Sequence, residues 1–153
     1  MGSNMLWCKS LTDWTKQYDS WMNTPGENSS NLSSIFFDYE IAFGEQKIED
    51  TIGDVIFRNA KNNTLFFDYL GNDALRKNSP LSFFKNFNLE VEGPYKNKFD
   101  IKTRALLPLV DGARLFALYF EVRGINNTYQ RFKQFAITDP KHAEVYLNCA
   151  EAF

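Results

Sequence analysis

Charged residues recur at regular intervals along the most apolar stretch of the chain, residues 105–122 and the positions just before it. At 100° per residue, Arg104, Asp111, Arg114 and Glu121 fall within a stripe about 100° wide on one helix. Asp111 and Arg114 are three positions apart and can pair with each other. Because the surrounding residues are large and apolar, we expect this helix to lie centrally and its polar face to line a cleft. A solvated helix face is the other interpretation of the pattern.

The start of this helix has the chemistry of an anion site. The first amide groups of a helix lack partners within it, and the helix dipole favours negative charge there. Lys102 and Arg104 add two cations, Asp100 can orient Lys102 by a charge-assisted hydrogen bond, and Arg114 can reach the same cleft. We therefore predict substrate-binding residues at Asp100, Lys102, Arg104, Asp111 and Arg114. The alternative is that Lys102 and Arg104 are solvated and pair with surface carboxylates.

The sequence offers no motif for autonomous catalysis. His142 is the only histidine, no G-x-S-x-G accompanies it, and we expect it to be a solvent-facing helix residue. Zinc-site spacings and the common phosphate-binding glycine loops do not occur. Two-metal nucleotidyl transfer needs closely spaced acids, but Thr15 follows Asp13 where a second acid is needed, and Asp38 and Glu40 point to different faces of a predicted helix. We expect no catalytic residue, no metal site and no turnover from this chain alone.

Composition is typical of an ordinary soluble domain. The 153 residues are 44% hydrophobic and 24% charged, which fits one domain with a single core. A net charge of −2 is too balanced for non-specific nucleic-acid binding. Without a signal sequence or an apolar run long enough to cross a bilayer, we expect a cytoplasmic protein with no membrane partner. Two distant cysteines indicate reduced thiols, and the 16% aromatic content predicts a core dominated by ring packing.

Hydrophobic periodicity predicts a mainly α fold, a helical bundle. Ser10 and Thr64 are the predicted N-caps of two helices, and Gly44 and Gly124 are predicted to end two others. Pro108 is tolerated only in the first turn of a helix, so the apolar helix should begin between residues 103 and 107. The predicted helices cover residues 10–22, 32–43, 48–60, 64–77, about 105–123, 127–135 and 138–153.

One short β-hairpin is predicted near residues 86–101. Phe87, Leu89 and Val91 alternate with polar residues, and Gly93 and Pro94 mark a turn. The last helix has no C-terminal glycine or asparagine, so we expect it to continue past Phe153.

Residues 99–118 read F-D-I-K-T-R-A-L-L-P-L-V-D-G-A-R-L-F-A-L. This run resembles the D-L-K-x-x-G-L-L-P-L-V-D-x-A-R-L-L-A-L signature of the nucleotidyltransferase substrate-binding domain. That domain closes bacterial proteins whose earlier parts are cyclic-nucleotide-binding-like, CBS and nucleotidyltransferase domains, related to the protein-PII uridylyltransferase family. The resemblance covers essentially the whole chain, since shorter similar segments lie at residues 1–7, 34–39 with Gly44, 80–84 and 127–132.

The resemblance implies a non-catalytic C-terminal domain of a larger multidomain signalling protein. Residues 1–153 would form one helical domain, with a nucleotidyltransferase domain preceding it in the same polypeptide. That preceding domain would hold the catalytic carboxylates and Mg²⁺, and this chain would shape one wall of the cleft for nucleotide or acceptor. The five predicted site residues are the candidates for that wall.

Two positions depart from the family pattern. Glu40 stands where the family usually has the arginine of F-F-D-x-R, which reverses a charge, and Ala105 stands where glycine is common. A function from another class is a protein-interaction or regulatory docking module that binds no small molecule. An exposed aromatic patch favours docking, whereas a polar cleft favours substrate contact.

Overall fold

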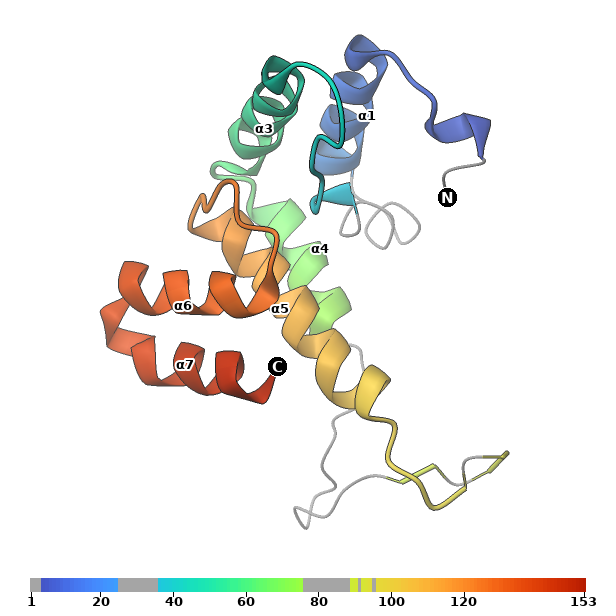
Figure 1. The fold of residues 1–153 in the computed structure, drawn as a ribbon, viewed down its shortest axis with the longest axis vertical. Coiled ribbons are helices and arrows are strands. Elements are labelled where there is room, and N and C mark those ends of the chain that lie inside the picture. Colours follow the sequence, from blue (N-terminus) through green and yellow to red (C-terminus); the bar gives the residue numbers. More distant parts are fainter. Residues whose placement is uncertain (1–3, 25–35, 76–88, 91, 95) are drawn as a thin grey trace. The chain divides into compact units, whose positions relative to one another are not determined.

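The computed structural model describes residues 4–24, 36–75, 89–90, 92–94 and 96–153 (Figure 1). The chain forms two compact units, which we call unit 1 (Met1–Leu70) and unit 2 (Gly71–Phe153). None of the described helices is long and apolar enough to cross a membrane. The regular elements of the described residues are all helical: η1 (Met5–Trp7), α1 (Leu11–Asn23), α3 (Gln46–Ala60), α4 (Thr64–Leu75), η2 (Lys102–Leu106), α5 (Leu107–Tyr119), α6 (Thr128–Thr138), η3 (Pro140–His142) and α7 (Ala143–Ala152).

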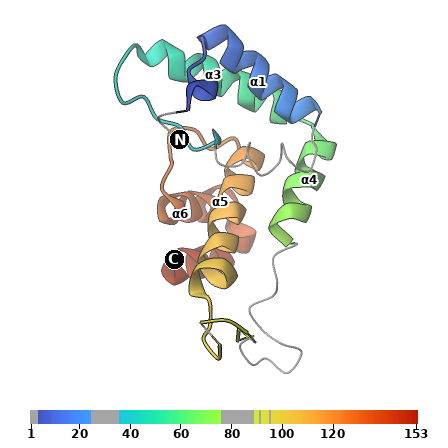
Figure 2. The ribbon, with the colours of Figure 1, turned by 90° about the vertical axis from the view of Figure 1, so that its right-hand side faces the viewer.

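In unit 1, α1 and α3 lie side by side (Figures 1 and 2). The predicted cap of α1 is confirmed, because Ser10 Oγ accepts the Asp13 amide at 3.1 Å and donates to the Asp13 carboxylate at 2.7 Å. The core is aromatic, as the composition predicts. The buried Tyr18 ring lies 5.6 Å from the ring of Trp21 and 6.2 Å from that of Phe37.

The start of α4 differs from the prediction by one residue. Asn63, not Thr64, is the cap, because Asn63 Oδ1 accepts the amide of Phe66 at 3.1 Å. The same side chain donates from Nδ2 to the carbonyl of Met22 at 3.0 Å. Asn63 therefore ends one loop and anchors the C-terminal turn of α1.

The predicted helix over residues 32–43 is wrong beyond Phe36. Residues 32–35 lie outside the described part of the chain, Phe36 is helical, and residues 37–43 form turns, bends and irregular backbone rather than a helix. The Phe36 ring contacts all three tryptophans, and the Phe36 carbonyl accepts a hydrogen bond from Tyr18 Oη at 2.6 Å. The Phe37 ring packs edge-on against Phe66. These tertiary contacts outweigh the local helical pattern.

In unit 2, the antiparallel pair α6 and α7 packs beside α5 (Figures 1 and 2). Small residues of α5 let the large rings of α6 and α7 approach closely. The core cluster contains the buried Ala113 and Ala117 of α5, Phe132 and Phe135 of α6, and Tyr146 and Ala150 of α7.

The helix that carries the predicted site begins earlier than residues 103–107. Residues 101–119 are helical without interruption, and Asp100 Oδ1 caps them by accepting the Thr103 amide at 3.0 Å. The turn η2 is π-helical, because the Leu107 amide donates to the Lys102 carbonyl five residues back. Pro108 lacks an amide hydrogen, and its ring clashes with the carbonyl four residues back in a regular α-helix. The wider π turn before Pro108 changes that spacing, so proline stands well inside the helix.

The end of α5 also differs from the prediction, which placed it at Gly124. Glu121 takes the left-handed conformation there, with φ of 53°. The Val122 amide donates to the Ala117 carbonyl at 2.8 Å, and the Glu121 amide donates to the Leu118 carbonyl at 3.3 Å. This is the hydrogen-bond pattern of a Schellman motif, in which glycine is the usual left-handed residue.

Replacing Glu121 by glycine is therefore expected to stabilise unit 2. The left-handed conformation costs an L residue about 1–2 kcal/mol, and the extra backbone entropy of glycine offsets part of the gain, which leaves about 0.5–1 kcal/mol. Urea unfolding of the E121G variant measures the difference. E121A is the control, because it removes the carboxylate and keeps the strain. Equal stability of the two variants would show that the backbone strain contributes nothing.

The β-hairpin predicted near residues 86–101 is not seen. Residues 86–88, 91 and 95 lie outside the described residues, and the rest of that range contains no strand. A tight loop is present, in which the Glu90 amide donates to the Lys98 carbonyl at 2.9 Å and the Asn97 amide donates to the Glu90 carbonyl at 2.8 Å. A two-stranded hairpin alone is marginally stable, and the helix that begins at Ile101 leaves only residues 99 and 100 between it and the loop.

Candidate functional site

Asp100 lies at the N-terminus of the long helix of unit 2, as predicted, but its bonds go to the backbone. Its Oδ1 accepts the Thr103 amide, and its carbonyl accepts the Arg104 amide at 3.0 Å. These contacts, first of all the backbone hydrogen bond from Thr103, hold the pKa of the Asp100 carboxyl below its ordinary value. The carboxylate of the chain itself therefore occupies the positive end of the helix. The sequence predicts a hydrogen bond between Asp100 and the ammonium group of Lys102. In the structure the Lys102 side chain is exposed.

Arg104 has a partner that the sequence did not indicate. Its Nε and Nη2 donate to Glu90 Oε1 at 3.2 Å and 3.0 Å, and 15% of the arginine side chain is exposed. Glu90 stands in the loop closed by its own bonds to Asn97 and Lys98. The ion pair therefore ties this loop to η2 and compensates the charge of Arg104.

Asp111 and Arg114 form the predicted pair, with 3.5 Å between Asp111 Oδ1 and Arg114 Nη1. Both side chains are largely shielded, with 15% and 19% of their surface exposed. The predicted four-residue stripe is not continuous, however. The π turn shifts the helical phase between Arg104 and this pair, and Glu121 lies beyond the last turn of α5. The Arg104–Glu90 and Asp111–Arg114 ion pairs are thus separate from each other on this helix.

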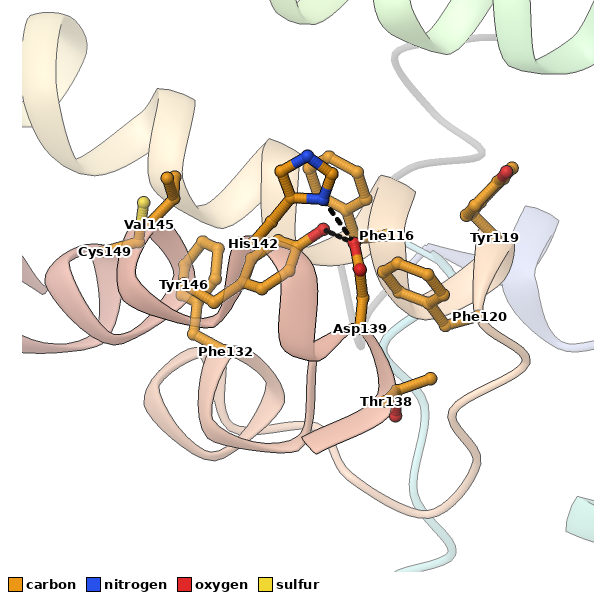
Figure 3. Close-up of a pocket in the computed structure, with 10 residues that line it drawn as sticks. All are labelled: Phe116, Tyr119, Phe120, Phe132, Thr138, Asp139, His142, Val145, Tyr146 and Cys149. Carbon is orange, nitrogen blue, oxygen red and sulfur yellow. Dashed lines mark hydrogen bonds and ion pairs between the residues drawn. The ribbon is translucent and has the colours of Figure 1, made fainter. Parts of the chain in front are cut away.

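A pocket of about 710 Å³ lies in unit 2, at the C-terminal end of α5 (Figure 3). Rings and aliphatic groups form most of its wall, and a few polar groups face one another within it. Its lining residues are Phe116, Tyr119, Phe120, Phe132, Thr138, Asp139, His142, Val145, Tyr146 and Cys149. None of the five predicted site residues is among them.

The polar side of this pocket is a hydrogen-bonded cluster around Asp139. Asp139 Oδ2 lies 2.8 Å from His142 Nδ1 and accepts the hydroxyl of Tyr146 at 3.2 Å (Figure 3). A carboxylate only accepts, so His142 Nδ1 carries a proton and Nε2 is the ring nitrogen directed away from Asp139. His142 was predicted to be a solvent-facing helix residue. Its side chain is 53% exposed, but it stands in η3 and is held by Asp139.

The electrostatic properties of the cluster follow from these contacts. The hydrogen bond from His142 is the main cause that holds the pKa of the Asp139 carboxyl below its ordinary value. Burial raises the pKa of the Tyr146 hydroxyl and, separately, that of the Cys149 thiol. The cluster thus presents an ionised carboxylate beside a neutral phenol and a neutral thiol. Because a nucleophilic cysteine needs its thiolate form, Cys149 serves as wall rather than as nucleophile.

Acid is expected to destabilise unit 2 through Asp139. A carboxyl group whose pKa is lowered by folding contributes stability above the pKa of an unfolded aspartate, about 3.9, and loses it as the pH falls through the folded value. The wild-type chain and D139N should therefore differ in melting temperature at about pH 5, and this difference should shrink as the pH falls below about 4. Asp100 titrates in both proteins and cancels. A difference that stays constant down to about pH 2 would contradict the contribution of Asp139.

No group of three or more histidine, cysteine, aspartate or glutamate side chains suited to a metal ion occurs among the described residues.

Comparison with known families identifies the family to which the chain belongs. No curated protein and no solved structure matches the chain. A family model described as "putative nucleotidyltransferase substrate binding domain" matches residues 64–153. This range includes the pocket, the five predicted residues and the run at 99–118, whereas the similarity at residues 1–7 and 34–44 lies outside it and stays a prediction. Since more than half of the sequence is matched, the chain belongs to the nucleotidyltransferase substrate-binding domain family.

Proposed function

We propose that this chain is the non-catalytic C-terminal partner of a nucleotidyltransferase domain in a cytoplasmic bacterial signalling protein, and that it supplies part of the cleft for nucleotide or acceptor. The pocket of unit 2 carries this proposal. It lies within the range that the family model matches, and its volume falls in the range of about 300–1,000 Å³ that small-molecule sites have. Apolar walls with a few convergent polar groups are typical of such sites.

The five residues predicted from the sequence form a second polar surface. With a rise of about 1.5 Å per residue, Arg104 and Tyr119 stand roughly 20 Å apart along the helix. Asp100, Lys102 and Arg104 therefore lie far from the pocket mouth at Tyr119. We propose them, with Asp111 and Arg114, as a further wall of the cleft in the full-length protein, where the preceding domain would hold Mg²⁺.

A docking module without a small-molecule ligand is the second candidate. Tyr119 and Val145 line the pocket and still expose 62% and 57% of their surface. Ile137, at the end of α6, exposes 72%. Exposed apolar groups beside a hollow also suit the side chains of a partner protein.

Titration of the ¹⁵N-labelled chain with ATP, CTP, GTP and UTP separates the two functions. Substrate binding predicts saturable shifts at the pocket or at residues 100–114, with affinity no better than about 1 mM because half of the cleft is missing. A docking module predicts no saturable shift with any of the four nucleotides. With Mg²⁺ or Mn²⁺ present, the chain alone should release no pyrophosphate. Turnover that survives rigorous purification would contradict the non-catalytic role.

A further inference from the structure

We propose that the pocket at the C-terminal end of α5 binds the base of a nucleotide, which stacks on the aromatic wall and donates an edge N–H to the Asp139 carboxylate. The phosphates remain outside the pocket. This inference rests on the proposed function and names the part of the substrate that unit 2 holds.

The wall of the pocket suits a flat ring. Five of the described lining residues are phenylalanine or tyrosine. Phe116 and Phe120 are stacked, with centroids 5.9 Å apart, and Tyr119 meets Phe120 at 5.1 Å with 74° between the planes. Phe116 and Phe120 also pack against the buried Phe135, so their positions are fixed before any ligand arrives. Every nucleobase has a π face that stacks on such rings.

The charge of the pocket excludes phosphate. Among the described residues that line the pocket there is no lysine or arginine. Asp139 contributes a negative charge, and the hydrogen bonds from His142 and Tyr146 favour its ionised form. A triphosphate inside the pocket would lie against this carboxylate, and repulsion between the like charges disfavours it there.

The free acceptor of the pocket is the second oxygen of Asp139. His142 and Tyr146 both bond Oδ2, and no other described residue bonds Oδ1. The Asp139 side chain is 25% exposed, and Figure 3 shows its carboxylate among the lining rings. A ligand that displaces water from this ionised oxygen has to supply a hydrogen-bond donor in its place, and bases present one as a ring N–H or an amino group. An aromatic group without such a donor can stack on the rings of the wall but cannot form a hydrogen bond with Asp139.

Adenosine and purine riboside are a matched pair of probes, because they differ only in the amino group of the base. We expect adenosine to shift the amide signals of Tyr119, Asp139, Val145 and Cys149, and purine riboside to bind about tenfold more weakly. Inorganic triphosphate should leave these signals unchanged. Equal binding of adenosine and purine riboside, or shifts of the same signals by triphosphate, would overturn the proposal.

D139N tests the acceptor directly. The amide oxygen of asparagine can accept the same hydrogen bonds from His142 and Tyr146. The NH₂ group of asparagine then faces the ligand, so a hydrogen-bond donor stands where the wild-type chain has an acceptor. Adenosine affinity should fall about tenfold and that of purine riboside should not fall, which removes the preference between the probes. The matched control is E144Q, which removes an exposed carboxylate from the first turn of α7 outside the pocket lining. It should leave both affinities unchanged.

V145W provides a second variant that does not disturb the Asp139 cluster. Val145 is largely exposed at the pocket mouth, so an indole there should block both nucleosides while the chain stays folded. Nucleotide shifts confined to residues 100–107 would overturn the base pocket and leave the proposed function standing. No saturable binding of any nucleotide or nucleoside would overturn both. Indole binding as strong as adenosine binding, without a preference for adenosine over purine riboside, would identify the hollow as a docking site for a protein side chain.

Discussion

Replacing Phe135 by alanine is expected to lower the free energy of unfolding of unit 2 by about 3–5 kcal/mol. The Phe135 side chain is completely buried. Its ring lies 5.7 to 6.0 Å from the rings of Phe116, Phe120, Phe132 and Tyr146, so it joins α5, α6 and α7. Truncation removes the apolar area and leaves a cavity that rigid neighbouring rings fill poorly.

Urea unfolding monitored by the amide signals of α5, α6 and α7 measures this loss. All three tryptophans lie in unit 1, so tryptophan fluorescence does not report on these helices directly. Tyr129 is the matched control, because it is an aromatic residue of the same helix whose side chain is 45% exposed. Y129A should cost less than about 1 kcal/mol. A cost below about 1 kcal/mol for F135A would show that Phe135 is not the centre of the core.

The second large effect is expected at Arg131, which is buried with only 4% of its surface exposed. Its Nε donates to the carbonyl of Ile125 at 2.5 Å, and its Nη2 donates to Asn126 Oδ1 at 3.2 Å. The guanidinium group therefore holds the loop between α5 and α6 against the body of α6. Methionine keeps much of the apolar stem but leaves a carbonyl without its donor. We expect R131M to lose about 2–3 kcal/mol of stability.

R131K separates charge from geometry. Lysine keeps the positive charge but cannot present the planar fork that reaches both oxygens. We expect R131K to lose nearly as much stability as R131M, measured by the same unfolding assay. Full stability in R131K would assign the effect to charge alone. Unchanged or higher stability in R131M would show that the desolvation free energy of the buried guanidinium group is at least as large as the stabilisation from its hydrogen bonds.

Local signals predicted the helices whose ends depend on one side chain. Ser10 caps α1, and Asn127 caps α6 by accepting the Gln130 amide at 3.0 Å. The prediction of helix ends failed where tertiary contacts determine the backbone conformation. Phe37 leaves the helical pattern, and its ring packs in the core of unit 1. In the same way, α5 ends before Gly124.

The end of α5 shows how packing overrides a glycine signal. Phe120 and Val122 both pack against the core cluster of unit 2. The chain must leave the helix between them, which forces Glu121 into the left-handed region. Gly124 lies too far along the chain to make that turn. The pattern of residue types indicates where a helix can end, whereas the core determines where it does.

In the candidate site, too, contacts within one helix were predicted and contacts that depend on packing between helices were not. The pairing of Asp111 and Arg114 depends on spacing within one helix and was predicted. The spacings of three and four residues between Asp139, His142 and Tyr146 are visible in the sequence. They do not show that these residues line a pocket, because α5 forms the opposite wall. Only the packing of α5 beside α6 and α7 places aromatic rings opposite the carboxylate. A helical projection also cannot predict the π turn, because it assumes one constant angle per residue.

The pairing of α6 with α7 has a consequence for the order in which unit 2 assembles. Phe135 and Tyr146 stand eleven positions apart in the chain, and their rings meet at 5.8 Å. Closing so short a loop costs little entropy, and contacts that are near in sequence speed folding. The helical hairpin can therefore form first and offer its rings as a template on which α5 docks. Since α5 precedes α6 and α7 in the chain, α5 leaves the ribosome first and has to wait for this template before the core of unit 2 can close.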